Sequence, residues 1–153
     1  EKFKKEGNDY KAILLESLAD RLAEAFAERL HELVRKEYWA YAPEENLSPE
    51  DLIHLRYQGI RPATGYPACP EHSEKQTLFD LLGATAKTGI SLTEHFSMFP
   101  TASVCGQYFS HKDSYYFGLE KVAKDQVIDY AKRKGVPVEY IEKFLPANLN
   151  YKI

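Results

Sequence analysis

Arg61 begins a twelve-residue segment that holds the side chains best suited to bind a ligand. Residues 61–72 read RPATGYPACPEH and contain three of the chain's eight prolines. A guanidinium is a planar fork that fits a carboxylate, and the tyrosine offers a flat aromatic wall. Because each proline fixes its own φ and favours an extended preceding residue, no helix or central strand can run through the segment. We therefore expect a stiff, open backbone whose amides and carbonyls can face a ligand.

The other polar motifs give weaker signals for chemistry. Glu28-x-x-His31 is half of a di-iron carboxylate pattern, but no second copy exists, so a surface pair is the simpler interpretation. Cys69 and His72 lack the ligand spacing of a zinc finger, which favours a structural role. The sequence also lacks a G-x-S-x-G nucleophile elbow and a glycine-rich phosphate loop. We assign no catalytic residue and no metal ligand.

Composition indicates one globular domain over residues 1–153. The chain is 44% hydrophobic and 28% charged, with a net charge of −3. The longest basic run is Lys132-Arg133-Lys134, which argues against nucleic-acid binding, and no apolar run is long enough for a membrane span. Two cysteines, Cys69 and Cys105, are too few for a disulfide framework, so we expect reduced thiols and a cytoplasmic protein.

A long helix must lie before the proline-rich segment. Asn8 or Asp9 can cap it, and it runs to about Trp39 with apolar residues at helical spacing. Ser48 and Pro49 then begin a short helix. The apolar stripe of the long helix comprises Leu14, Leu18, Leu22, Phe26, Leu30, Val34 and Tyr38.

The pattern after the proline-rich segment predicts one helix, then strands, then helices. Ser73 and Gln76 form a capping box for a helix that ends near Gly83. Strands are expected at 90–98, 103–109 and 114–119, with a turn at 111–113, and helices at 123–134 and 137–145. The predicted fold class is α+β, with helices packed on a small antiparallel sheet, a long N-terminal helix, three central strands and two C-terminal helices.

Several motifs in order resemble one known family. They are LADRLAEAFAERLHE, YWAYAPEENLS, YQGIRPATGYPACPEHSEK, ASVCGQYFSH and DQVIDYAKRKG. Together they resemble the activation domain of cobalamin-dependent methionine synthase, which binds S-adenosylmethionine. The resemblance covers residues from about 10 to 151, and only the C-terminal part of that longer domain. It implies an incomplete activation domain, present as an excised fragment, a split protein or one piece of a proteolysed complex.

The resemblance implies a set of cofactor-binding residues. The motif arginine contacts S-adenosylmethionine in the family, and the following alanine and tyrosine line the site, which gives Arg61, Ala63 and Tyr66 here. Ala63 would act through its backbone. Glu24 matches a further contact position and could accept a hydrogen bond from the amino group of the cofactor. By spacing alone, however, a solvated helix face formed by Glu24, Glu28 and nearby polar residues is clearly favoured.

Tyr116 and Phe117 match a tyrosine pair that lies at the cofactor in the family. Phe117 replaces the second tyrosine, so only its backbone could hydrogen-bond the ligand. Because neighbours on a strand point to opposite sides, we expect Tyr116 to face the proline-rich segment and Phe117 to pack inward.

The function implied by the resemblance is reactivation of a methyltransferase. The full enzyme moves a methyl group from 5-methyltetrahydrofolate to homocysteine, and its cobalamin, carried on a separate domain, is occasionally oxidised to Co(II). An electron from a flavodoxin-type donor and a methyl group from S-adenosylmethionine restore it. The alternative interpretation is a non-catalytic protein-interaction module with a rigid proline-rich docking loop. A free-standing methyltransferase is less well supported, because the glycine-rich turn of those enzymes is missing.

Overall fold

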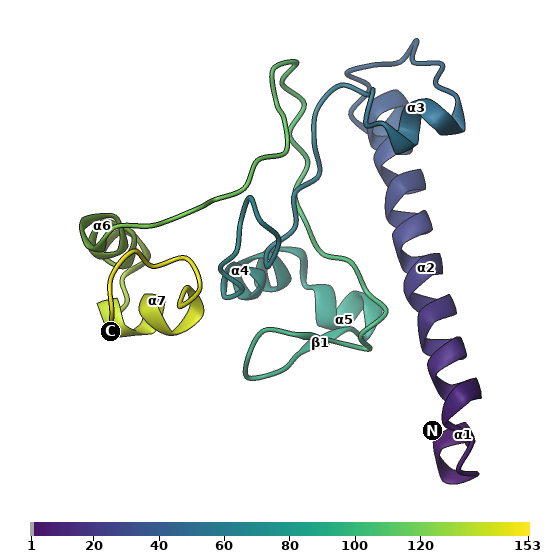
Figure 1. Ribbon diagram of the computed structural model, residues 1–153. Helices are drawn as coiled ribbons and strands as arrows, with labels where there is room; N and C mark the ends of the chain where they lie inside the picture. Colours follow the sequence, from purple (N-terminus) through teal and green to yellow (C-terminus); the bar gives the residue numbers. More distant parts are fainter. Residues whose placement is uncertain (1) are drawn as a thin grey trace.

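The computed structural model describes residues 2–153. Its helices and one small hairpin form the expected α+β arrangement, with a long N-terminal helix and two C-terminal helices (Figure 1). The elements are α1 (Lys2–Lys5), α2 (Asp9–Leu33), η1 (Val34–Tyr38), α3 (Pro49–Ile53), α4 (Glu74–Leu82), α5 (Ala84–Thr88), β1 (Ser91–Leu92), β2 (Met98–Phe99), α6 (Lys124–Lys134) and α7 (Val138–Phe144). Within residues 2–153, no helix combines the length and hydrophobicity that a membrane crossing requires.

The long helix forms as predicted and stands along one side of the molecule (Figure 1). The side chain of Asn8 caps it by accepting a hydrogen bond from the Lys11 amide at 3.1 Å. At its C-terminal end α2 continues without a break into the π-helical turn η1. Most of its apolar stripe faces solvent, with Leu22 and Phe26 exposed by 63% and 66%. Near its start α2 contacts α1, and its C-terminal third packs against more distant parts of the chain.

The short helices around the proline-rich segment begin and end mostly as predicted. Ser48 and Asp51 form a reciprocal capping box at the start of α3. Gly83 ends α4 in the left-handed conformation, at φ 58°. Ser73 is the N-cap residue of α4 as predicted, but the predicted capping box is wrong, because the amide and hydroxyl of Ser73 both donate to the carboxylate of Glu71.

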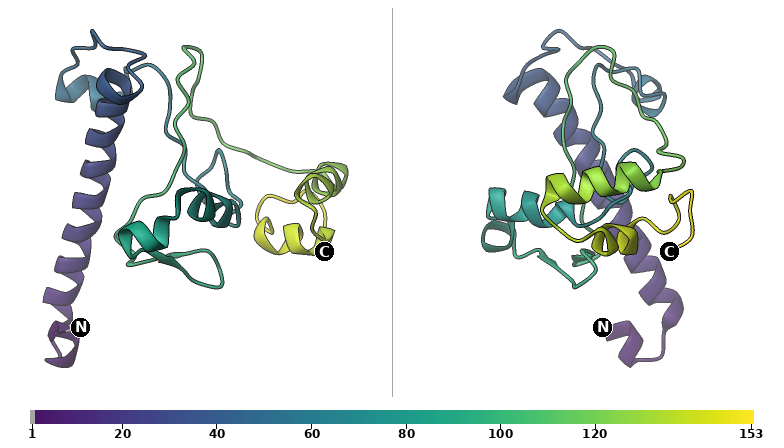
Figure 2. Two further views of the ribbon diagram at one scale, coloured as in Figure 1. Left: turned by 180° about the vertical axis from the view of Figure 1, so that it is seen from behind. Right: turned by 90° about the vertical axis from the view of Figure 1, so that its left-hand side faces the viewer.

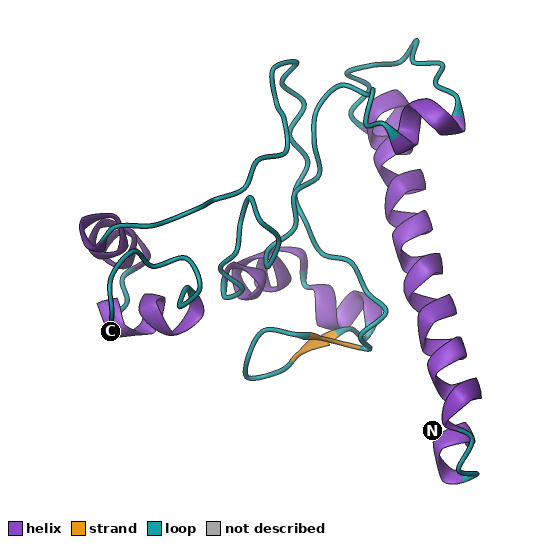
Figure 3. Ribbon diagram, in the orientation of Figure 1, coloured by secondary structure: helices purple, strands orange, loops and turns teal. Residues whose placement is uncertain are grey.

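The prediction of three central strands is wrong in number. The segment 90–98 folds back on itself, so that β1 pairs antiparallel with β2, and this pair is the sheet of residues 2–153 (Figure 3). The segments 103–109 and 114–119 are extended but form no ladder. The first pairs with the start of the proline-rich segment, through an isolated bridge between Ile60 and Phe109 and a hydrogen bond from the Gln107 amide to the Pro62 carbonyl. Because prolines lack an amide proton, that neighbour cannot supply the donors of a longer ladder.

The two C-terminal helices form a small unit with its own apolar core. Val127 of α6 and Ile141 of α7 are fully buried in it, and both helices match their predicted positions. The unit lies on the far side of the molecule from α2 and is joined by an extended connection (Figure 2). Lys134 attaches it to the start of α4 by ion pairs with Glu71 and Glu74.

Candidate ligand-binding site

Arg61 lies at the centre of a hydrogen-bonded cluster between α2 and the proline-rich segment. Its Nη2 donates to a carboxylate oxygen of Glu28 at 2.7 Å. Its Nη1 lies 3.2 Å from the Tyr57 hydroxyl and 3.3 Å from His31 Nδ1. The backbone amide of Arg61 donates to the Tyr116 hydroxyl at 2.9 Å. Side chains from three separate segments therefore fix both the backbone and the guanidinium of Arg61.

His31 is fully buried among aromatic rings, with Tyr57 edge-on at 4.9 Å and Tyr108 stacked at 5.2 Å between ring centroids. The surface pair expected at Glu28-x-x-His31 is therefore wrong for the histidine. Since a guanidinium can only donate, Nδ1 of His31 must accept from Arg61. In the neutral ring Nε2 then carries the proton and donates to the Tyr41 hydroxyl, 3.2 Å away.

A buried ion pair packs against this cluster. Arg35 is fully buried and makes a bidentate pair with Glu45, at 2.8 Å from Nε and 2.7 Å from Nη2. Its guanidinium carbon also lies 4.3 Å from the centre of the Tyr57 ring. Burial, together with the nearby charges of Arg35 and Arg61, lowers the pKa of His31 to about 3. The imidazole therefore stays neutral at physiological pH.

The polar face of α2 meets the proline-rich segment at its C-terminal end and faces solvent further back. Glu28, His31 and Arg35 follow at intervals of three and four residues, so that they share this face. Glu24, one turn earlier, is exposed. The π-helical turn η1 widens the helix where Arg35 is buried. Such turns occur often at functional sites. The C-terminal part of this face thus belongs to the candidate site, whereas the part around Glu24 is solvated.

Residues 63–66 of the proline-rich segment, together with His72 at its end, line a cavity of about 140 Å³. Gly65 is required at its rim, because it has a φ of 96° and an added Cβ would lie 2.2 Å from the His72 ring. Ala63 and Tyr66 are on the wall. The lining residues are Ala63, Thr64, Gly65, Tyr66, His72, Lys75, Met98, Ser103, Val104 and Cys105.

This cavity contains hydrogen-bonding groups that the chain itself uses only in part. Lys75 is buried, and its Nζ lies 2.6 Å from His72 Nδ1. Burial lowers the pKa of the Lys75 ammonium. The buried hydroxyl oxygen of Thr64 has no hydrogen-bond partner among residues 2–153. Polar groups on an otherwise apolar wall are typical of a small-molecule site.

Four of the six predicted site residues lie along the proline-rich segment or touch it. Arg61 and Tyr116 are joined directly, which confirms the expected orientation of Tyr116. Ala63 and Tyr66 line the adjacent cavity.

The other two predicted residues are placed differently. Phe117 is 49% exposed and its ring contacts Tyr115, so the prediction that it packs inward is wrong. The extended segment belongs to no sheet, and therefore has no dry second face on which Phe117 could be buried. Glu24 is exposed on α2.

Sequence reasoning missed His31 and Tyr57 as members of the site. The one available signal for His31 was its place, three residues after Glu28 and four before Arg35, on a polar stripe of a long helix. Tyr57 gave no comparable signal, because only the folded loop before Arg61 turns its ring toward α2. A cluster formed by three segments cannot be read from spacing within one of them.

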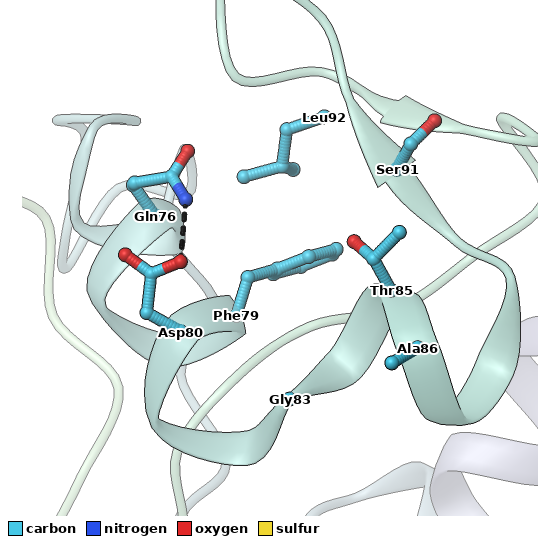
Figure 4. A pocket seen from close by; sticks show the side chains of 8 residues that line it. All are labelled: Gln76, Phe79, Asp80, Gly83, Thr85, Ala86, Ser91 and Leu92. Carbon is cyan, nitrogen blue, oxygen red and sulfur yellow. Dashed lines mark hydrogen bonds between the residues drawn. The ribbon is translucent and has the colours of Figure 1, made fainter.

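A larger cavity lies between α4, α5 and β1 (Figure 4). It has a volume of about 540 Å³ and an apolar base formed by Phe79 and Leu92. Gln76 donates to Asp80 at 2.8 Å on its polar side. None of the six predicted residues lines it. Within residues 2–153, no group of acidic, histidine or cysteine side chains is arranged to hold a metal ion.

Comparison with known proteins places this chain in a family. Residues 1–135 match the family of vitamin B12 dependent methionine synthase activation domains, and the chain belongs to that family. A crystal structure of the MetH reactivation domain bound to AdoHcy is 58% identical to the chain and superposes with a TM-score of 0.95. The match covers 98% of this chain and 46% of that one, so this chain spans about half the length of that relative.

Proposed function

We propose that this chain binds S-adenosylmethionine through the Arg61 cluster and the adjacent cavity, and that it helps to reactivate a cobalamin-dependent methionine synthase. The observation that carries the proposal is the fixed guanidinium of Arg61 beside a cavity lined by Ala63 and Tyr66. A relative 58% identical to the chain is described as bound to AdoHcy, which is S-adenosylmethionine without its methyl group.

The residues of the site suit the amino-acid end of such a ligand. The contacts above occupy both protons of Arg61 Nη1 and one of Nη2. Nε and the second Nη2 proton have no partner within residues 2–153, and they can bind a carboxylate side-on. Ala63 and Tyr66 line the cavity, and we propose that they contact the adenosine end.

The chemistry required of this chain is positioning. The nucleophile would come from a reduced cobalamin on a separate domain, and the sulfonium already carries a good leaving group, so this chain needs no general base. The chain holds the donor by its two ends and keeps the methyl group in reach. This role agrees with a site made of binding groups, in which His31 stays neutral.

The proposal extends to the whole protein. We propose that it is a methyltransferase that transfers the methyl group of 5-methyltetrahydrofolate to homocysteine in the cytoplasm. Its cobalamin-binding domain and a flavodoxin-type electron donor are the proposed partners of this chain. The family membership and the free thiols of Cys69 and Cys105 support the proposal.

Calorimetric titration with AdoHcy tests the proposal. We expect Arg61→Ala to lose about 1.5–3 kcal/mol of binding free energy, the scale of a hydrogen bond to a charged group. Arg56→Ala is the matched control, because Arg56 pairs with Asp51 on the surface outside the site. A natural full-length protein that does not bind AdoHcy, or an Arg61→Ala variant with unchanged affinity, would contradict it.

A further inference from the structure

The two contacts on Nη1 of Arg61 involve neutral side chains rather than a carboxylate. Tyr57 places its hydroxyl at 3.2 Å and His31 its Nδ1 at 3.3 Å. Both side chains are buried. They accept hydrogen bonds from Nη1 without adding a second negative charge to that of Glu28, which pairs with Nη2.

These two acceptors are themselves held rigidly. The Tyr57 ring is packed between the His31 ring and the Arg35 guanidinium. His31 is further fixed by the stacked ring of Tyr108 and by the Tyr41 hydroxyl. A buried ring that contacts groups on both sides has few alternative rotamers, so its polar atom occupies a defined position. Because Nη1 donates to two acceptors in fixed positions, the orientation of the guanidinium plane is fixed as well.

We infer that Tyr57 and His31 are positioning residues that aim the guanidinium of Arg61 at the carboxylate of the amino-acid end of the ligand. This inference rests on the proposed function. Glu28 contacts the other terminal nitrogen and carries a charge that competes with a ligand carboxylate. Tyr57 and His31 fix the direction of the guanidinium, whereas Glu28 partly offsets its positive charge. The amino-acid end is therefore recognised by Arg61 only while its Nη1 is held.

The sharpest test removes single atoms and compares two ligands. AdoHcy has the carboxylate, whereas 5′-methylthioadenosine has the adenosine and thioether but no amino-acid end. In the natural full-length protein, Tyr57→Phe removes only the hydroxyl and keeps the ring. We expect its affinity for AdoHcy to fall roughly tenfold, with the affinity for 5′-methylthioadenosine unchanged. Tyr151→Phe is the matched control, since it removes the hydroxyl that lies 2.8 Å from Glu142 in the C-terminal unit, outside the site.

A double-mutant cycle shows whether the effect passes through Arg61. If it does, Tyr57→Phe combined with Arg61→Met binds AdoHcy no more weakly than Arg61→Met alone. His31→Phe should behave like Tyr57→Phe, and His31→Gln should restore part of the affinity because its amide oxygen can accept a hydrogen bond. If His31→Phe does not fold, the tyrosine variant alone decides the question.

Four outcomes would overturn the inference. Unchanged AdoHcy affinity in Tyr57→Phe would remove the positioning role, while binding of AdoHcy by the wild type would leave the proposed function standing. An equal loss for both ligands would show a general structural effect. Additive losses in the double mutant would show that Tyr57 acts independently of Arg61. Absence of AdoHcy binding by the wild type would overturn the inference and the proposed function together.

Discussion

The Arg61 cluster and the C-terminal helical unit are stabilised by opposite means. The cluster is made of charged and aromatic side chains from three segments, with Arg35 and His31 fully buried. The α6–α7 unit has an apolar core from one continuous stretch of chain, centred on Val127 and Ile141. Polar contacts are directional and costly to leave unpaired, whereas apolar contacts tolerate small shifts. In this molecule, directional polar contacts fix side-chain orientation at the candidate site, whereas apolar packing holds the C-terminal helices together.

The largest expected effect tests the polar side of this comparison. Arg35→Met should cost about 3–5 kcal/mol of unfolding free energy, because it leaves the Glu45 carboxylate buried without its partner. Urea denaturation measures the loss. The double variant Arg35→Met, Glu45→Gln should lose less than the single one, since no unpaired charge then remains. A single variant as stable as the wild type would mean that the ion pair does not hold the cluster together.

The apolar unit gives the next largest effect. Ile141→Ala removes a fully buried side chain and should cost about 2–5 kcal/mol of unfolding free energy. Because the unit lies apart from the Arg61 cluster, we expect the affinity for AdoHcy to stay the same under native conditions. Denaturant unfolding and calorimetric titration on one preparation check both statements. Coupled losses of stability and affinity would contradict the separation of the two regions.

The buried histidine predicts a dependence of stability on pH. His31 has a pKa of about 3 when folded and about 6.5 when unfolded. Between these values the unfolded chain binds the extra proton, so stability falls as the pH falls. From pH 7 to 5.5 we expect His31 to contribute a loss of about 1 kcal/mol. Urea denaturation across this range should show a smaller loss in His31→Phe. Equal slopes in both proteins would place the histidine in contact with water.

The smallest effect is expected outside both regions. Phe117 is half exposed, so Phe117→Ala should change the unfolding free energy by no more than about 0.5 kcal/mol. Tyr116→Ala should instead weaken AdoHcy binding, because it removes the acceptor for the Arg61 amide. Thermal denaturation and titration of the two variants give the ranking. A larger stability loss in Phe117→Ala would show that its ring is covered in solution.

The sequence by itself determined the features that depend on neighbouring residues. Helical spacing and caps gave α2, α3, α4, α6 and α7, because a helix forms its hydrogen bonds within four residues. The prolines gave an open segment from 61 to 72, since proline restricts the backbone locally. The same segment carried the family resemblance, and with it Arg61, Ala63 and Tyr66.

Only the tertiary structure decided the features that depend on distant partners. The strands expected at 103–109 and 114–119 need neighbours with free amides, and their neighbour is rich in proline. His31 and Tyr57 joined the site because α2 and the loop before Arg61 meet in space. Burial of a polar side chain requires a partner from elsewhere in the chain, and spacing along one helix cannot supply that partner. The sequence motif was therefore enough to predict Arg61 as a site residue, whereas the orientation of its guanidinium depends on the fold.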